Sequence, residues 1–244
     1  MYAVITAGGP IDGEYAQLAG TPLKALAPVR GRTMLARTID ALRECGIDRI
    51  AVVGGTAVRD ACEALAPLRV IPDAGSGSGN VFGALDAWPD DASLLYLTCD
   101  MPYIDARSLQ WFLDRIDPGT LSMPLCEHAA FVRRFPDAPP FGIVLSGERV
   151  VNTGAFHIPA GSRARVRKLA TTMFDARKAP WKMASVAGPL VLLRFALGRV
   201  SVGALEARAR QVLGIPVTAL RDAPPELAYD ADTAIEYTYA VDRS

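Results

Sequence analysis

The chain has 244 residues, half of them hydrophobic, and its 26 lysines and arginines are balanced by 26 aspartates and glutamates. This balance argues against a nucleic-acid-binding protein, which usually carries a basic excess. The apolar half is ample for the core of one large α/β domain or two small ones.

The cysteines and the apolar runs of the chain further limit the class of protein to which it can belong. The four cysteines stand alone, without a C-x-x-C pair, which argues against a zinc ribbon or a disulfide framework and fits reduced thiols. No basic segment followed by an apolar one opens the sequence, as a signal peptide would. The longest apolar run, 190–197, is interrupted by Arg194 and is too short for a bilayer, which needs about 20 residues. We expect a cytoplasmic protein without a membrane span.

The first predicted element is a strand over residues 2–5, which ends in a turn containing Ala7, Gly8 and Gly9. Glycine lets a backbone come close to a ligand, and a strand that ends in a glycine turn can expose amides to phosphate groups. Lys24 then follows as the first cation of the chain. The segment predicts a binding site for a nucleoside triphosphate.

Strand and helix patterns alternate through the next hundred residues. Helices are predicted from 33 to the glycine at 46, over 57–65, over 81–87 and over 106–116. Apolar strands are predicted over 50–53, 69–71 and 94–98, and residues 73–80 read as a flexible loop. This order predicts an α/β fold with a mainly parallel sheet that helices cover on both faces.

The pattern changes after about residue 120. Strands are predicted over 131–135, 142–145, 149–151 and 217–220, residues 162–213 are mostly helical, and a last helix follows Asp232. We expect one domain, 1–244, with a mostly helical insertion at about 160–213. The stretch 190–197 is apolar almost all round, which indicates burial. Packing on the sheet, a homodimer contact and a site for an apolar acceptor remain open for it.

Lysine is rare in this chain, which holds 22 arginines and only four lysines. Lys24 is the only lysine in the first 167 residues. A lysine in an arginine-rich chain suggests a need for a compact point charge, the form suited to a phosphate in a tight loop. The alternative is a solvated surface lysine.

Carboxylates mark two further positions. Asp100 lies just beyond the strand 94–98, where open α/β sheets bind ligands, and a carboxylate there can hold Mg²⁺. Alternatively, Asp100 caps the helix that begins near residue 105 or holds the Met101–Pro102 turn. Asp230 and Asp232 share a face of an extended segment and could approach one metal, although Asp232 could equally cap the last helix.

Several of these motifs occur together in one order. They are Ala7-Gly8-Gly9, Lys24-Ala25-Leu26, Pro28-Val29-x-Gly31-Arg32-x-Met34-Leu35, Leu97-Thr98-Cys99-Asp100-Met101-Pro102 and Asp230-Ala231-Asp232-Thr233. In this order the chain resembles the nucleotidyltransferases that include the molybdenum-cofactor guanylyltransferases and the sugar-phosphate pyrophosphorylases. The resemblance is strong over the first 105 residues and weak between 120 and 215.

The resemblance implies a Rossmann-like three-layer sandwich with a mainly parallel mixed sheet, the nucleotide-diphospho-sugar transferase fold. It implies Mg²⁺-dependent transfer of NMP from an NTP to a small phosphorylated acceptor, with release of pyrophosphate. Ala7, Gly8, Gly9 and Lys24 would hold the phosphates and base, Gly79 and Asn80 would approach the base or ribose, Asp100 and Asp232 would bind the metal, and Asn152 would contact the acceptor. Lys24 and Asp100 would be the catalytic residues.

One departure from the family pattern concerns the arginine that usually follows the glycine turn. Here the turn continues with Asp12 and Glu14 and no cation before Lys24. The missing cation could come from Arg30, Arg32 or a later cluster at 177–182. We hypothesise that Lys178 and Lys182 of this cluster bind the acceptor phosphate, the alternative being a solvated basic helix end.

The departure leaves two other functions open. The chain could be a catalytically weak nucleotide-binding or regulatory protein on the same fold. A glycosyltransferase that uses a nucleotide-sugar fits less well, because such enzymes usually carry an Asp-x-Asp metal motif where this chain has the single carboxylate of Asp100.

Overall fold

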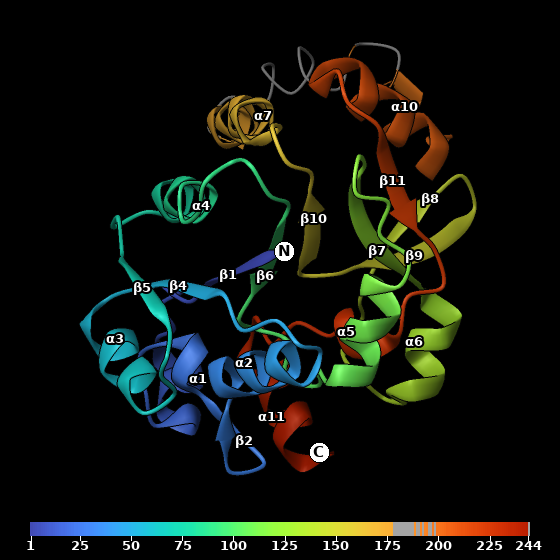
Figure 1. Ribbon diagram of the computed structural model, residues 1–244. Helices are drawn as coiled ribbons and strands as arrows, with labels where there is room; N and C mark the ends of the chain where they lie inside the picture. Colours follow the sequence, from blue (N-terminus) through green and yellow to red (C-terminus); the bar gives the residue numbers. More distant parts are fainter. Residues whose placement is uncertain (178–187, 189–190, 192, 195–196, 198, 244) are drawn as a thin grey trace.

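The computed structural model describes residues 1–177, 188, 191, 193–194, 197 and 199–243. Across these residues the centre of the molecule is a nine-stranded sheet in the order β5-β4-β1-β6-β10-β7-β9-β8, with β11 beside β7. Helices lie on both sides of it (Figure 1), so the predicted three-layer α/β sandwich with a mixed sheet is confirmed. The strands of this sheet are β1 (Tyr2–Thr6), β4 (Ile50–Gly54), β5 (Arg69–Pro72), β6 (Leu94–Thr98), β7 (Leu121–Glu127), β8 (Ile143–Leu145), β9 (Glu148–Asn152), β10 (Ala155–Ile158) and β11 (Val217–Leu220).

The N-terminal part of the sheet is parallel. Strand β1 pairs in parallel with both β4 and β6, and β4 pairs in parallel with β5. All five residues of β4 are buried, as expected for a strand that is covered on both faces. The apolar runs in the sequence therefore predicted this half well.

The second part of the sheet is largely antiparallel. Strand β10 pairs antiparallel with β6 and β7, β7 with β9, and β9 with β8, while β11 runs parallel to β7. The sequence pattern did not predict β7 or β10. Strand β7 contains Pro124, and proline inside an apolar run argues against a central strand.

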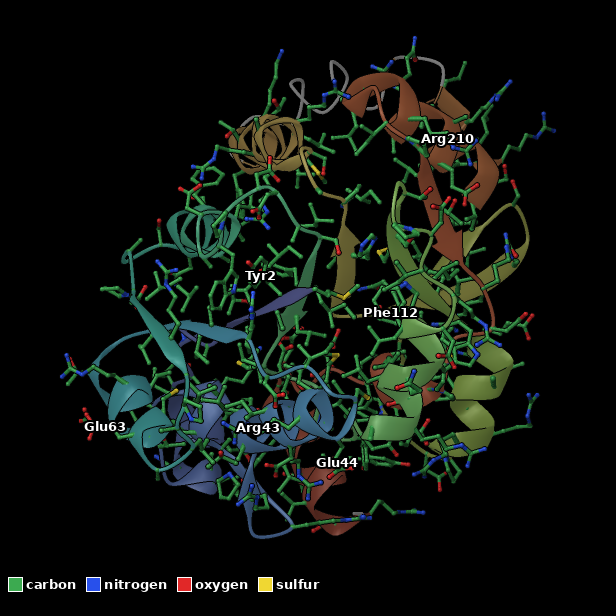
Figure 2. All side chains as sticks on the ribbon, viewed as in Figure 1. Tyr2, Arg43, Glu44, Glu63, Phe112 and Arg210 are labelled. Carbon is green, nitrogen blue, oxygen red and sulfur yellow. The ribbon has the colours of Figure 1, made fainter. Side chains whose placement is uncertain are left out.

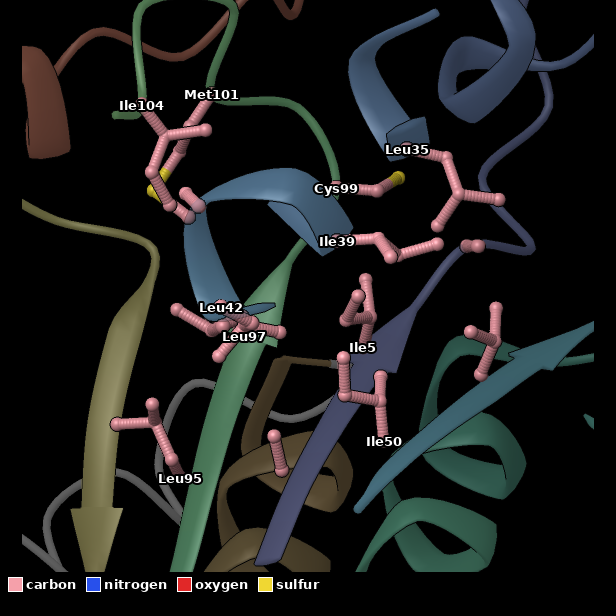
Figure 3. Close-up of a cluster of buried hydrophobic side chains, with 14 of the residues drawn as sticks. Ile5, Leu35, Ile39, Leu42, Ile50, Leu95, Leu97, Cys99, Met101 and Ile104 are labelled. Carbon is pink, nitrogen blue, oxygen red and sulfur yellow. The ribbon is translucent and has the colours of Figure 1, made fainter. Parts of the chain in front are cut away.

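Three helices cover one face of the parallel strands: α2 (Met34–Glu44), α3 (Thr56–Glu63) and α5 (Ala106–Leu113). Their apolar sides meet alternate residues of β1, β4 and β6 in one buried cluster, where Leu35 and Ile39 of α2 lie near Ile5 and Ile50 (Figure 3). Figure 2 shows Phe112 of α5 within this interior and Glu63 at the outer rim. The periodicity that predicted these helices is thus the periodicity of their buried sides.

The opposite face carries α4 (Gly77–Leu85) and α7 (Arg163–Arg177) (Figure 1). Helix α4 begins four residues before the predicted start at 81. The Ser76 side chain accepts a hydrogen bond from the Gly79 amide and so caps the helix. A glycine- and serine-rich stretch that reads as a loop is therefore the first turn of a capped helix.

The predicted strand over 131–135 is wrong. These residues belong to α6 (His128–Arg134) and its C-cap, with Phe131 and Phe135 both buried. Residues four positions apart lie on one face of a helix, so both rings enter the same aromatic cluster. The aromatic residues favoured a strand prediction, but the segment is a helix because a helix buries both phenylalanines in this cluster.

The C-terminal helices complete the molecule. Helix α10 (Val202–Leu213) leads into β11, and α11 (Ala234–Asp242) contacts the short α1 (Gly13–Ala19). Short 3-10 turns, η1 (Lys24–Leu26) and η2 (Pro225–Leu227), and the hairpin of β2 (Pro28–Val29) with β3 (Arg32–Thr33) connect the larger elements. Among the described residues, no helix is both long and apolar enough to cross a membrane.

Candidate active site

A cleft of about 910 Å³ opens where β1 and β6 end. The glycine turn after β1 contributes Gly8 and Gly9 to its wall, and the end of β6 contributes Thr98 and Asp100. Lys24 enters from η1, whose backbone is tied to the turn because the Lys24 amide donates a hydrogen bond to the Gly9 carbonyl at 3.0 Å. The carboxyl ends of parallel strands are where α/β sheets bind ligands.

Lys24 contacts two other predicted site residues, Asp100 and Asp232. Its Nζ donates to Asp100 Oδ2 at 3.2 Å and also to Asp232 Oδ1. Asp232 stands just before Thr233, which caps α11 through a capping box with Glu236. Similarly, the helix after β6 is capped by Asp105. Asp100 and Asp232 are therefore not the helix caps that the sequence left open, and both face Lys24.

The charges of this cluster are partly shielded from water. The Lys24 and Asp100 side chains are 13% and 19% exposed, whereas Asp232 is 62% exposed. Burial by itself would lower the pKa of Lys24, but the charge of Asp100 and the hydrogen bonds to both aspartates raise it above its ordinary value. Lys24 is consequently a fixed positive charge rather than a proton donor.

The two carboxylates fit a magnesium ion. Asp100 Oδ1 is buried and has no hydrogen-bond partner, so one strong acceptor is free at the wall of the cleft. Both aspartates touch the same Lys24 nitrogen, so they can face one cation. No group of three or more His, Cys, Asp or Glu side chains is arranged for a metal in the described part of the chain. Mg²⁺ typically uses only one or two carboxylates, with substrate phosphates and water as its other ligands.

Asp230 behaves differently from its neighbour Asp232. Burial, followed by the charges of Asp100 and Asp232, raises the pKa of Asp230 well above its ordinary value. Its Oδ1 is buried without a hydrogen-bond partner. The two aspartates therefore do not share one face as predicted. Asp230 is directed into the protein, and Asp232 is directed toward solvent.

The nucleotide-binding prediction included Asn80, which the structure brings beside the glycine turn. Its side chain is buried, and its Oδ1 accepts from the Ala74 amide at 2.9 Å. A Cβ on Gly8 would lie 2.6 Å from Asn80 Nδ2, so only glycine allows this approach. Gly8, Gly9 and Asn80 all line the cleft.

Two other residues of that prediction do not line the cleft. Ala7 is fully buried, and its amide donates to the Val53 carbonyl at 2.8 Å within the sheet region. The amide of Gly79 donates to Ser76 Oγ at 3.1 Å in the cap of α4. Both residues shape the walls of the cleft through backbone contacts.

Of the predicted acceptor residues, Asn152 is the one that the structure describes, and it does not line the cleft. Asn152 is exposed at the end of β9 and is absent from the described lining of the cleft. Lys178 and Lys182 lie outside the described residues. The following glycine does reach the site, because the Gly154 carbonyl accepts from the Thr98 amide at 2.8 Å.

No arginine among the described residues of the cleft wall replaces the one that the family pattern has after the glycine turn. Lys24 is the only basic residue among the described residues that line the cleft. Arg32 forms an exposed ion pair with Asp40. Asp12 and Glu14 line a separate cavity of about 320 Å³ beside Asp232.

Sequence reasoning missed several lining residues, among them Asp73, Tyr96 and Thr98. Tyr96 and Thr98 precede Asp100 at two-residue spacing, and alternate residues of a strand point to one face. That spacing was the available signal. Asp73 follows β5, and its Oδ1 accepts from the Gly75 amide at 2.9 Å.

Comparisons with known proteins identify a family and a fold for this chain. The model of the MobA-like NTP transferase domain family matches residues 3–171. A comparison with curated proteins found no match.

Solved structures are similar over nearly the whole chain. A structure described as a hypothetical transferase from Thermus thermophilus is 28% identical, with a TM-score of 0.83 over 97% of this chain and 98% of that one. A nucleotidyl transferase from Methanothermobacter thermautotrophicus is 16% identical, with a TM-score of 0.59 over 99% and 96% of the two chains. A CTP:phosphocholine cytidylyltransferase from Streptococcus pneumoniae is 12% identical, with a TM-score of 0.55 over 99% and 97%. Because their sequence identity is low, the last two similarities support the fold alone.

Proposed function

Since the chain belongs to the MobA-like NTP transferase domain family and is a nucleotidyltransferase, we propose that it transfers a nucleoside monophosphate from an NTP to a phosphorylated acceptor and releases pyrophosphate. One observation carries this proposal. Lys24 Nζ lies between Asp100 and Asp232 at the wall of the cleft where β1 and β6 end. A cation flanked by two carboxylates provides contacts for phosphate oxygens and for a divalent metal at one place.

The reaction is an in-line displacement. An oxygen of the acceptor phosphate forms a bond to the α-phosphorus of the NTP, and the bond from that phosphorus to the α–β bridging oxygen breaks. Pyrophosphate leaves with the bonding electron pair. A phosphate monoester is already ionised near neutral pH, since its second pKa is about 6, so no general base is needed. In agreement, no histidine lines the described cleft, and His157 is fully buried with Nδ1 2.8 Å from the Thr120 carbonyl oxygen.

The residues take distinct roles in this proposal. Lys24 contacts a phosphate oxygen in exchange for one of its carboxylate partners. Asp100 and Asp232 would hold Mg²⁺, which when bound neutralises charge on the phosphates. Gly8 and Gly9 bring backbone close to the nucleotide, and Asn80 keeps that turn in place.

The experiment measures nucleotide binding and turnover separately. Titration calorimetry with the four NTPs, with and without Mg²⁺, identifies the base, and a pyrophosphate-release assay with a panel of phosphate monoesters tests transfer. Asp100→Asn should abolish Mg²⁺-dependent release. Asp86→Asn provides the matched control, because Asp86 is an exposed carboxylate that pairs with Arg167 outside the cleft.

A catalytically weak nucleotide-binding protein is the second candidate. It is favoured by the presence of Lys24 as the only basic residue in the described lining, where a triphosphate brings several negative charges. Tight NTP binding without pyrophosphate release for any acceptor would support it and would contradict the transferase proposal.

A further inference from the structure

A second cavity adjoins the cleft and differs from it in chemistry. It has a volume of about 220 Å³ and is walled by apolar side chains of β6, β7, β10, α4 and α7. These include Val81, Tyr96, Leu121, Phe156, Ile158 and Val166. We call this cavity the apolar pocket. The polar group that its described walls contain, the Tyr96 hydroxyl, is already hydrogen-bonded to Thr6 Oγ1 at 3.0 Å.

Strand register places these side chains on one face of the sheet. Tyr96 of β6 stands opposite Phe156 of β10, and their rings meet edge to face with centroids 6.0 Å apart. Ile158 follows Phe156 at two-residue spacing and therefore points the same way. The intervening His157 contacts the Thr120 carbonyl. Helices α4 and α7 lie over this face (Figure 1) and contribute Val81 and Val166.

The apolar pocket is open to solvent. Val81, Tyr96, Leu121, Phe156 and Val166 are all partly exposed. In a closed core these side chains would be covered, because removing apolar surface from water is favourable. A partly exposed cavity walled by apolar side chains offers room for an apolar group of a ligand.

The apolar pocket is continuous with the proposed active site. Val81 and Tyr96 line both cavities. Tyr96 and Thr98 are alternate residues of β6 and point to one face, and Asp100 follows two residues after the strand ends. A molecule with a phosphate near Lys24 and Asp100 can therefore reach the apolar pocket with a short chain or a ring.

We infer that the acceptor is an amphiphilic phosphate monoester, whose phosphate meets Lys24 and whose alkyl, isoprenoid or aromatic group fills the apolar pocket; this inference rests on the proposed transfer reaction. An apolar cavity of about 150 Å³ in another protein holds benzene, so about 220 Å³ accommodates a somewhat larger group. A sugar would bury hydroxyls there without hydrogen-bond partners, which is unfavourable.

A titration with alkyl phosphates of increasing length tests this inference. Methyl, butyl and hexyl phosphate are titrated into the protein with Mg²⁺ and a non-hydrolysable analogue of the NTP that binds best. Each methylene that enters the pocket should lower the Kd about fourfold, until the pocket is full. Sorbitol 6-phosphate, which is of similar length but polar, should bind more weakly than hexyl phosphate.

Two valine variants distinguish binding in the apolar pocket from a general effect of adding a phenylalanine. Val166→Phe fills the pocket from α7, so hexyl phosphate should then bind no more tightly than butyl phosphate. Val212→Phe makes the same change at a 40% exposed position of α10 outside the pocket and should keep the wild-type dependence on length. Melting temperatures confirm that both variants are folded.

The outcomes are distinguishable. A Kd that does not change with chain length, or a length dependence that Val166→Phe leaves intact, overturns the inference alone while nucleotide binding stands. Tighter binding of sorbitol 6-phosphate than of hexyl phosphate does the same. If no nucleotide analogue binds, the proposed function fails and this inference fails with it.

Discussion

The ammonium group of Lys24 is surrounded by carboxylates that raise its pKa above the ordinary value despite its burial. A lysine in this state keeps its charge at any physiological pH. Its contribution is electrostatic, in contrast to the lysines that act as bases after burial lowers their pKa. Asp100 Oδ1 beside it is a buried acceptor without a hydrogen-bond partner in the described structure.

Replacing Lys24 with alanine should reduce kcat about 10²- to 10³-fold, because the charge that stabilises the transferred phosphate is lost. Pyrophosphate release measures this loss, and circular dichroism checks the fold. Arg59→Ala removes an exposed cation of α3 that pairs with Asp60, and it should leave kcat unchanged. Wild-type turnover by Lys24→Ala would show that the glycine-turn segment has been misinterpreted.

His157 should make the free energy of unfolding depend on pH. Burial is the main reason that its pKa is lowered in the folded protein, although the hydrogen bond to Thr120 opposes the shift. As the pH falls below 6.5, unfolded chains bind a proton that the folded protein does not, so the free energy of unfolding decreases until the pH reaches the lower, folded-state pKa.

His157→Asn removes this titration, so its free energy of unfolding should vary less than that of the wild type between pH 6.5 and 5. Urea denaturation at pH 8, 6.5 and 5.5 measures the difference between the two proteins. Above pH 7 the two curves should run parallel. Equal slopes on the acid side would contradict the assignment.

At the scale of elements, prediction succeeded where a segment's own residues determine its structure. Strands β1, β4 and β6 are continuous apolar runs, and α2 has a regular apolar spacing with Thr33 as its cap. Strand β10 was missed because its four residues include a histidine, and only its neighbours β6 and β7 make it a strand. Such strand pairing depends on residues that are distant in the sequence, so the local sequence pattern cannot predict it.

The same distinction applies to the site. Lys24, Asp100 and Asp232 were predicted from residue type, strand position and family resemblance, and the structure brings them together. The roles of Ala7 and Gly79 were implied by the family resemblance, and in the structure the amides of both residues donate hydrogen bonds within the protein. The apolar pocket could not be predicted, because its walls come from five elements whose arrangement only the folded sheet defines.

The junction of β6 with the turn before β10 allows a test of packing. A Cβ on Gly154 would lie 2.0 Å from Thr98 Oγ1, so Gly154→Ala should destabilise the protein by about 1–3 kcal/mol. Thr98→Ala removes that oxygen and leaves Met101 Sδ, 3.2 Å away, as the nearest neighbour. The double variant should therefore be less destabilised than Gly154→Ala.

Urea denaturation of the four proteins in this cycle measures the coupling between the two positions. Gly203→Ala is the control, because a Cβ there meets nothing within 4 Å and the residue lies in α10. It should be neutral or stabilising by up to about 1 kcal/mol. Additive effects of Thr98→Ala and Gly154→Ala would show that the two side chains do not compete for the same space.

At the scale of the whole molecule, the parallel and antiparallel parts of the sheet have different proposed roles. The turns that follow the parallel strands β1 and β5 line the cleft proposed for the nucleotide, as expected at the carboxyl edge of an open α/β sheet. The antiparallel strands β10 and β7 extend the opposite side of β6 and form the base of the apolar pocket. Strand β6 lies between them and ends at Asp100.

Metal removal should affect ligand binding and leave the fold unchanged. The described part of the chain has no cluster of three metal-binding side chains, so EDTA should not change the melting temperature of the free protein. With Mg²⁺, an NTP at 100 times its Kd should stabilise the protein by about 2.7 kcal/mol, and EDTA should abolish that gain. Thermal denaturation measures both. A lower melting temperature with EDTA alone would indicate a structural metal.

The hydrogen bond between Lys24 and Asp232 joins residues that are 208 positions apart in the sequence. During synthesis on the ribosome, β1, η1 and Asp100 emerge well before Asp232. A nascent chain that has already formed the parallel half of the sheet therefore still lacks one of the two carboxylates around Lys24. The charge cluster can be completed only after α10 and β11 have been translated, so ribosome-bound chains that end before residue 232 should carry the glycine turn but no finished site.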